Sequence, residues 1–173
     1  LGKRMRSKQA KVLHPVAGQA MVLYSVGLGL RVAGDRVAVV VGHQADLVRQ
    51  VIGRATSGKR GGSSVAIVEQ RKQLGTGHAV LQSRPVFAVG KRGAPSSYLI
   101  LNGDTPLLQE KTVRELLRVH EAERATVTIL TAVLADASGY GRVVRANSAS
   151  RGVSRIVEDR DANAEEQAIR EIN

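Results

Sequence analysis

The sequence predicts an α/β fold, in which a mixed, mostly parallel sheet is flanked by helices and carries an added β-hairpin. Between residues 37 and 133, short apolar runs bounded by turn residues alternate with segments of helical spacing. This alternation is typical of parallel or mixed sheets covered by helices. Beyond residue 133 the pattern changes to two strands around a turn. A length of 173 residues favours one domain over residues 1–173.

One helix separates the first two predicted strands. Residues 37–41 (VAVVV) and 65–68 (VAIV) are continuously apolar and rich in β-branched side chains, as in strands buried on both faces. Apolar spacing predicts a helix over residues 46–52. The stretch 53–64 is rich in Gly, Ser, Lys and Arg, which predicts an exposed loop.

The next segment repeats this order of helix, loop and strand. Residues 76–82 are predicted to be helical, with Thr76 as the N-cap. A loop is expected over residues 90–97. Residues 98–101 (YLIL) then predict a third buried strand, which the turn residues Asn, Gly and Asp end.

The last part of the chain holds one more helix and three more strands. Apolar residues at spacings of three and four predict an amphipathic helix over residues 112–124. Residues 126–133 predict a fourth strand. Residues 141–146 and 153–157 predict paired strands around a turn at residues 147–152, which is the added hairpin.

Composition limits the possible classes of function. The chain has no Cys, which excludes disulfides, thiolate catalysis and cysteine zinc sites. With one Phe, three Tyr and no Trp, the core is expected to be aliphatic. No apolar run reaches the length of a membrane span and no signal-peptide pattern is present, so a cytoplasmic location is expected. The formal net charge of +11 suits nucleic acid, membrane phosphates or a nucleotide.

The basic residues are spread along the whole chain, but one cluster stands out in residues 1–11, which contain no acid. A glycine loop (GKRM, residues 2–5) followed by Lys11 can wrap phosphates. Gly2 lets backbone amides approach, while Arg4 and Lys11 neutralise phosphate oxygens. The alternative is a solvated basic segment without a ligand.

A second cluster combines Gln70 with the run QLGTGHA at residues 73–79. A glutamine side chain offers both a donor and an acceptor, so it can pair with the edge of a base. Gly75 and its neighbours let the backbone approach the ring. The alternative is a strand-to-helix turn with a capped helix and no ligand.

A third cluster is LNGD at residues 101–104. A carboxylate just beyond the carboxyl end of a buried strand lies where α/β sheets bind ligands. Asp104 is also a hard oxygen ligand suited to Mg²⁺. The alternative is that Asp104 only caps the next turn.

The fourth cluster follows the predicted hairpin strands. It consists of GYGR at residues 139–142, then Glu158, then Asn173, all of which could meet sugar hydroxyls. Taken separately, each is typical of turn or surface chemistry. The four histidines have no metal-ligand spacing, and His78 is expected to be packed rather than catalytic.

These clusters, in this order, resemble the uridylyltransferase domain of bacterial bifunctional N-acetylglucosamine-1-phosphate uridylyltransferase/glucosamine-1-phosphate acetyltransferases. These enzymes belong to the sugar-phosphate nucleotidylyltransferase superfamily. The resemblance implies a Rossmann-like fold of the nucleotide-diphospho-sugar transferase type. The matching stretches cover nearly the whole chain: residues 2–5, 11–14 with 17–18, 73–79, 103–104 with 106–107, 139–142, 156–158 and 171–173.

The resemblance implies roles for the nucleotide-binding residues. Arg4 and Lys11 match the cations that hold the triphosphate and the transferring phosphoryl group, with Gly2 in the glycine loop. Gln70 and Gly75 match the residues that read uracil, and Thr76 matches a neighbour in the same loop.

The resemblance also implies a metal ligand and a sugar site. Asp104 matches the ligand of Mg²⁺. Gly141, Glu158 and Asn173 match the positions that hold the N-acetylglucosamine group.

The chain departs from the family pattern at both ends. The family's first strand, its first loop glycine and its second metal ligand have no counterpart, so residues 1–173 are expected to be one domain truncated at both ends, without a closing element at residues 171–173. The family's β-helix domain, with its acetyltransferase activity, is also absent. The resemblance implies a parent that is a homotrimer through that domain. Residues 1–173 alone are expected to be inactive and marginally stable.

The implied reaction transfers UMP from UTP to N-acetylglucosamine 1-phosphate, giving UDP-N-acetylglucosamine and pyrophosphate for cell-wall precursor synthesis. Two alternatives stay open. One is a nucleotidylyltransferase for another sugar phosphate or for dTTP or GTP. The other is a non-enzymatic basic module, which the scarcity of aromatic side chains disfavours as a binder of single-stranded nucleic acid.

Overall fold

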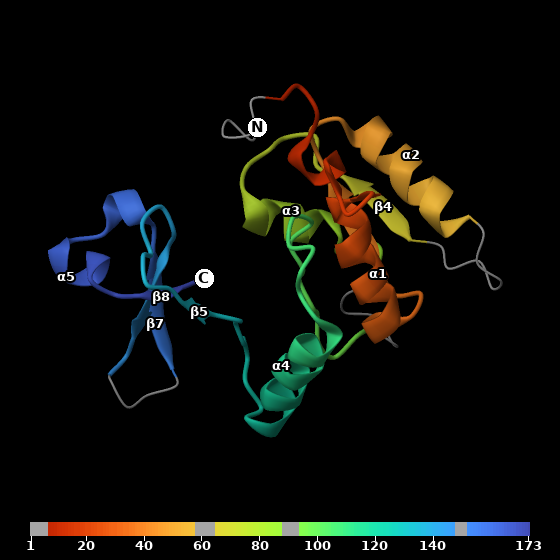
Figure 1. Cartoon of the computed structure of the whole chain (residues 1–173). Coiled ribbons are helices and arrows are strands. Elements are labelled where there is room, and N and C mark those ends of the chain that lie inside the picture. Colours follow the sequence, from red (N-terminus) through yellow and green to blue (C-terminus); the bar gives the residue numbers. More distant parts are fainter. Residues whose placement is uncertain (1–6, 58–64, 88–93, 148–151) are drawn as a thin grey trace. The chain divides into compact units, whose positions relative to one another are not determined.

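The computed structural model describes residues 7–57, 65–87, 94–147 and 152–173. The chain divides into two compact units, residues 1–113 and 114–173. Figure 1 labels helices and strands of both units. The prediction of a single domain stays a prediction.

A parallel pair of strands organises the first unit. Strands β3 (Ala38–Val41) and β4 (Ala66–Glu69) pair in parallel, from Ala38 opposite Ala66 to Val41 opposite Glu69. Helix α2 (Ala45–Thr56) lies between them in sequence and makes the crossover (Figure 1). These elements confirm the predicted α/β class and the predicted strands over residues 37–41 and 65–68.

Helix α1 (Met21–Ala33) was not predicted from the sequence. Its apolar residues are interrupted by Gly27 and Gly29, and glycine lowers helix propensity by about 1 kcal/mol each. The structure gives Gly29 a packing role, because a Cβ there would lie 3.5 Å from the side chain of Val37. Helix α1 follows a short hairpin of β1 (Pro15–Val16) and β2 (Gln19–Ala20).

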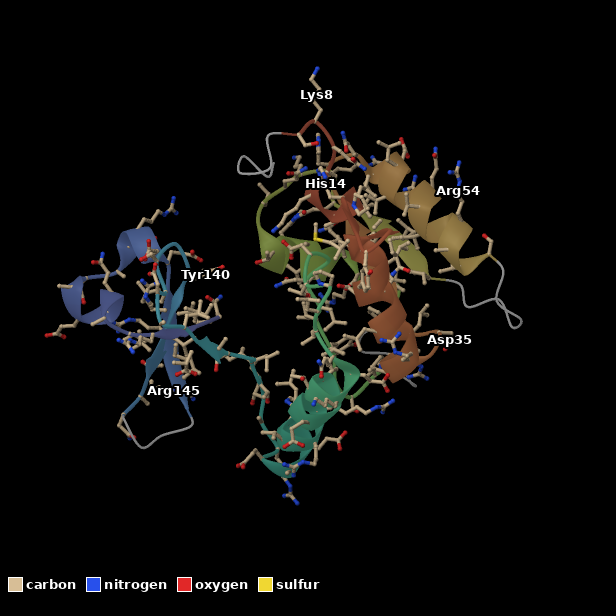
Figure 2. The ribbon with its side chains drawn as sticks, viewed as in Figure 1. Lys8, His14, Asp35, Arg54, Tyr140 and Arg145 are labelled. Carbon is tan, nitrogen blue, oxygen red and sulfur yellow. The ribbon has the colours of Figure 1, made fainter. Side chains whose placement is uncertain are left out.

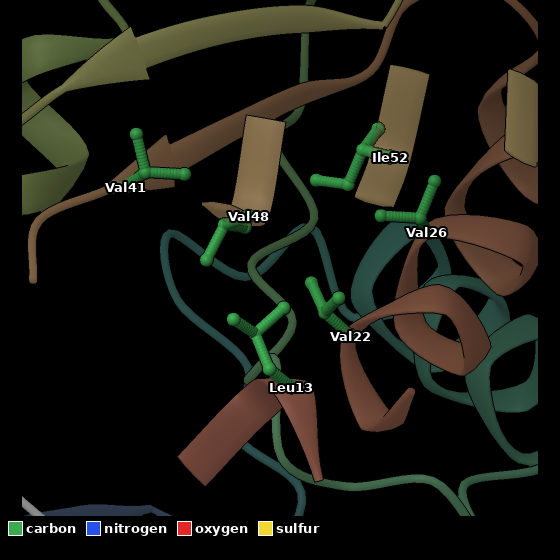
Figure 3. Packing of buried hydrophobic residues seen from close by; sticks show 6 residues of the cluster. All are labelled: Leu13, Val22, Val26, Val41, Val48 and Ile52. Carbon is green, nitrogen blue, oxygen red and sulfur yellow. The ribbon is translucent and has the colours of Figure 1, made fainter. Parts of the chain in front are cut away.

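The core of the first unit is aliphatic, as the composition predicted. It joins the 3-10 turn η2 (Lys11–Leu13) to α1, α2 and β3 (Figure 3). Ile52 is the most buried member, with 1% of its surface exposed. Leu13 belongs to the same cluster, so the core fixes the turn that carries Lys11. The buried members are Leu13, Val22, Val26, Val41, Val48 and Ile52.

The second unit contains an antiparallel sheet in the order β5–β8–β6–β7. Strands β6 (Arg142–Arg145) and β7 (Val153–Val157) form the predicted hairpin. Strand β8 (Glu171–Ile172) pairs with β6 and with β5 (Ala132–Val133). The expectation of no closing element at residues 171–173 is therefore wrong, because Glu171 and Ile172 form a strand inside the sheet.

Polar contacts tie this sheet together. The Arg145 guanidinium on β6 forms an ion pair with the Glu171 carboxylate on β8. Thr131 Oγ1 donates a hydrogen bond to Glu171 Oε1 at 2.7 Å. The hydrogen bonds from Arg145 and then from Thr131 lower the pKa of Glu171. The carboxylate is therefore held in its charged form between the strands.

The predicted helices are present, and two of them, α2 and α4, have shifted ends. Helix α3 (Thr76–Gln82) has the predicted bounds, but its N-cap is Gly75 rather than Thr76 and no side chain caps it. Gly75 has a φ of 95°, a conformation that glycine adopts without strain. Helix α4 (Glu110–Ala122) starts two residues before the predicted 112–124. The remaining short elements are η3 (Asp159–Asp161) and α5 (Ala164–Gln167).

Two predicted strands and part of a predicted loop differ from the structure. Residues 98–101 form no strand, and Tyr98 and Ile100 are 46% and 65% exposed. Within the described ranges no strand lies alongside to complete a ladder with them. Of residues 126–133 only β5 is a strand. Helix α2 continues to Thr56, and the predicted loops over 53–64 and 90–97 fall largely outside the described residues.

Across the part of the chain that the structure describes, no helix is both long enough and apolar enough to cross a membrane.

Truncation of Ile52 tests the core of the first unit. We expect Ile52→Ala to lower the free energy of unfolding by about 2–5 kcal/mol, because the side chain is fully buried. Leu47 on the same helix is 47% exposed, so Leu47→Ala is the matched control with a much smaller loss. Urea unfolding followed by circular dichroism measures both. Equal losses in the two variants would contradict the packing described.

Candidate functional site

An ion pair joins Lys11 and Asp104, two residues that the sequence analysis singled out independently. Lys11 Nζ lies 2.6 Å from Asp104 Oδ2, although 93 residues separate them in the chain. The two side chains are 48% and 34% exposed, so a ligand can reach both. A cation and a hard carboxylate thus meet at one accessible point of the first unit.

The sequence predicted that Asp104 follows a buried strand, but residues 98–101 form no strand. Contacts with α1 and η2 hold the Asp104 turn in place instead. Ser25 Oγ donates to the Asn102 carbonyl at 2.7 Å, and Thr105 Oγ1 donates to the same oxygen at 3.0 Å. A Cβ at Gly103 would lie 3.4 Å from Val12 Cγ1. The bare backbone at Gly103 therefore lets this turn pack against the element that carries Lys11.

A glutamine side chain holds the segment that leads to Lys11. The Ala10 N–H donates to Gln44 Oε1 at 2.7 Å, and Gln44 Nε2 donates to the Lys8 carbonyl at 2.9 Å. Both polar ends of one amide are therefore engaged by this backbone. Gln44 precedes α2 in the left-handed conformation, with a φ of 54°. Its role depends on a contact distant in sequence, so no local pattern indicated it.

The Gln44 contacts leave the basic side chains of this segment accessible. Lys8 is exposed and points away from the rest of the first unit (Figure 2). Gly2 and Arg4, the other predicted phosphate-loop residues, lie outside the described residues.

Gln70 and Gly75 also come together. Gln70 Nε2 donates to the Gly75 carbonyl at 3.0 Å. The same nitrogen lies 2.9 Å from His78 Nδ1, on the first turn of α3. Thr76 is exposed at the start of that helix.

These residues gather beyond the carboxyl ends of β3 and β4. Gln70 directly follows β4, and its N–H donates to the Val41 carbonyl at the end of β3 at 2.7 Å. A Cβ at Gly42 would lie 3.2 Å from Gln73 Nε2. The carboxyl edge of a parallel pair is where α/β sheets bind ligands. Gln44, which holds the Lys11 segment, follows the same β3 strand.

The three predicted sugar-binding residues meet at one end of the sheet of the second unit. Arg142 pairs with both Val157 and Ile172, so the flanking residues Gly141, Glu158 and Asn173 lie beyond the same sheet end. A Cβ at Gly141 would lie only 2.5 Å from Asn173 Oδ1. Glu158 and Asn173 are exposed.

The described residues offer few ligands for a metal ion. In the described ranges no group of three or more His, Cys, Asp or Glu could hold a metal by itself. The Asp104 carboxylate is half-exposed and already faces one cation, the Lys11 ammonium. Protein Mg²⁺ sites commonly use one or two carboxylates, with substrate phosphates and water completing the shell. Asp104 fits a Mg²⁺ site of that open kind.

Comparison with known proteins gives one family match. The model of the family described as "Nucleotidyl transferase" matches residues 2–166. The bifunctional protein GlmU of Exiguobacterium sibiricum is 46% identical over 172 residues, which are 99% of this chain and 35% of that protein. The GlmU of Brevibacillus brevis is 47% identical over 99% of this chain and 34% of its own length. That of Thermoanaerobacter pseudethanolicus is 42% identical over 100% and 34%. The chain thus spans about a third of the length of these relatives.

The Gln44 amide provides a test of how the Lys11 segment is held. We expect Gln44→Gly to lower the free energy of unfolding by about 1–2 kcal/mol, because it removes two hydrogen bonds while glycine tolerates the left-handed backbone. Hydrogen exchange at the Ala10 amide should accelerate, since that N–H loses its acceptor. Gln50, exposed on α2, gives the control Gln50→Ala. Unchanged exchange at Ala10 in Gln44→Gly would contradict the contact.

Proposed function

The chain belongs to the nucleotidyl transferase family, and on that premise we propose that it transfers UMP from UTP to N-acetylglucosamine 1-phosphate. The observation that supports this most is the Lys11–Asp104 pair, whose Lys11 segment is held by Gln44 after β3, while the Gln70 and Gly75 contacts follow the partner strand β4. The similar GlmU proteins point the same way. The comparisons do not favour the two alternatives, a different nucleotide or sugar phosphate and a basic binding module.

We assign the nucleotide to the first unit. Gln70 pairs with the edge of the uracil ring, and Gly75, which has no side chain, lets the ring approach the backbone. Thr76 contributes from the exposed first position of α3. Lys11 neutralises phosphate oxygens, together with Arg4 and the amides near Gly2.

The proposed reaction is a single in-line displacement. A phosphate oxygen of N-acetylglucosamine 1-phosphate forms a bond to the α-phosphorus of UTP, and the bond from that phosphorus to the bridging oxygen of pyrophosphate breaks. The attacking oxygen is already an anion, so no protein nucleophile or base is needed. This chain's residues act by positioning and by charge neutralisation. Lys11 and Arg4 offset the charge that builds on the phosphates.

Asp104 is the residue that we assign to Mg²⁺, in keeping with its accessible carboxylate. When bound, the ion would neutralise charge on the substrate phosphates. Lys11 would then exchange its contact with Asp104 for a substrate phosphate.

We assign the sugar to the second unit. Gly141, Glu158 and Asn173 offer a bare backbone, a carboxylate and an amide at one sheet end. These groups can donate to and accept from sugar hydroxyls and an N-acetyl group. A second activity and a trimeric assembly of the whole protein stay predictions from the resemblance, as does action in the cytoplasm.

Replacement of the proposed metal ligand tests the function. In the natural protein we expect Asp104→Asn to slow pyrophosphate release from UTP and N-acetylglucosamine 1-phosphate by at least about 100-fold, because one charged oxygen ligand is lost. Asp46→Asn, on an exposed carboxylate of α2, should leave the rate unchanged. The assay is run across a Mg²⁺ titration. A rate for Asp104→Asn that equals wild type at limiting Mg²⁺ would refute this assignment.

The crowding at Gly141 gives a test specific to the sugar. A Cβ at Gly141 would lie 2.5 Å from Asn173 Oδ1 and 3.3 Å from Ile156 Cγ2, so the Asn173 side chain, which we assign to the sugar, would have to move. We therefore expect Gly141→Ala to raise KM for N-acetylglucosamine 1-phosphate by roughly 10-fold or more, with KM for UTP little changed. Gly53→Ala, where a Cβ meets no neighbour, is the control. A larger effect on UTP than on the sugar phosphate would contradict the assignment.

A further inference from the structure

We propose that His78 orients the Gln70 amide so that Gln70 presents an acceptor, Oε1, to the base. His78 is then a positioning residue that sets nucleotide specificity. The inference rests on the proposed function, in which Gln70 reads the base. It goes further because it identifies His78 as the residue that determines which base edge can pair with Gln70.

The Gly75 carbonyl fixes which end of the Gln70 amide faces inward. The amide atom 3.0 Å from this carbonyl is Nε2. A carbonyl oxygen can only accept, so an amide oxygen in the same place would set two acceptors against each other. Gly75 can aim its carbonyl there because its φ of 95° is available to glycine.

His78 engages the second hydrogen of the same amide. Its Nδ1 lies 2.9 Å from Gln70 Nε2. Because Nε2 is a donor there, Nδ1 must accept, and the ring proton of the neutral imidazole is on its other nitrogen. The neutral ring can accept from only one of its two amide neighbours. We assign the acceptor to Nδ1 because Gln70 lies nearer, whereas Gln82 Nε2 lies 3.2 Å from the other ring nitrogen and donates to the His78 carbonyl at 3.3 Å. Two fixed acceptors, Gly75 and His78, thus hold both hydrogens of the Gln70 amide.

These contacts leave the Gln70 Oε1 atom as an acceptor that can bind the base. Both N–H groups of Gln70 are satisfied within the protein, and no described residue donates to Oε1. An acceptor at this place pairs with a base N–H. Uracil has an N–H at ring position 3, whereas cytosine has an acceptor there. The arrangement therefore favours UTP over CTP, because cytosine would leave two acceptors opposed.

A purely packing role for His78 makes a different prediction. His78 is only partly buried, and a packed ring could be replaced by an apolar side chain without effect on base choice. A positioning role requires an acceptor at this point. His78→Leu removes the acceptor, whereas His78→Asn offers the oxygen of a side-chain amide in its place. The two variants therefore separate packing from orientation.

The experiment measures kcat/KM for UTP and for CTP in the natural protein and in its variants. We expect His78→Leu to reduce the UTP-to-CTP ratio by at least about 10-fold, because the Gln70 amide can then turn its donor to the base. We expect His78→Asn to restore part of the ratio, and Gln50→Ala, on an exposed residue of α2, to leave it near wild type. Thermal unfolding identifies any variant that does not fold. An unchanged ratio in a folded His78→Leu would overturn the inference.

A spectroscopic readout tests the same geometry without turnover. We expect nitrogen NMR of the neutral His78 ring to place its proton on Nε2, and a proton on Nδ1 would overturn the inference. Absence of nucleotidyl transfer from every nucleotide tested would instead overturn the proposed function. The two failures are therefore distinguishable, since the tautomer does not depend on activity.

Discussion

The parallel pairing of β3 with β4 is the constraint on which the first unit's candidate site depends. In a parallel pair both strands end at the same edge, so whatever follows them in sequence is brought together in space. The pairing continues one step past β4, where the Gln70 N–H donates to Val41. That contact sets the start of the Gln70 to His78 segment beside the segment of Gln44. The Gln44 amide then holds the backbone that leads to Lys11.

Much of the fold was predictable because local pattern and tertiary packing agree. Strands β3 and β4, helices α2 and α3 and the β6–β7 hairpin lie where apolar periodicity indicated. The failures are cases in which long-range packing decides. Helix α1 contains two glycines that lower helix propensity, yet Gly29 permits close contact with Val37. Residues 98–101 have the composition of a buried strand, but a strand also needs a neighbour with which to form a ladder.

The candidate residues were predictable from the sequence in kind, but their grouping was not. Lys11 and Asp104 were selected for their charge, and only the structure shows them 2.6 Å apart. Gln44 gives no local signal, because its amide bonds to backbone more than thirty residues away. His78 was expected to be packed. Its contact with Gln70 depends on the Gly75 turn, which brings α3 back toward the end of β4, and no local sequence pattern indicates that contact. The assigned roles of these residues stay proposals, and Gly2 and Arg4 lie outside the described residues.

The strand order of the second unit also constrains when that unit can form. Strand β8 lies between β5 and β6, although both precede it in the chain, and its Glu171 bonds to Thr131 across 40 residues. The sheet therefore cannot close until residues 171–172 are available. Pairing over such a separation has a large loop-closure entropy and slows folding. During synthesis on the ribosome, the β6–β7 hairpin can form early and locally, whereas β5 can pair only after β8, which is made later than both hairpin strands.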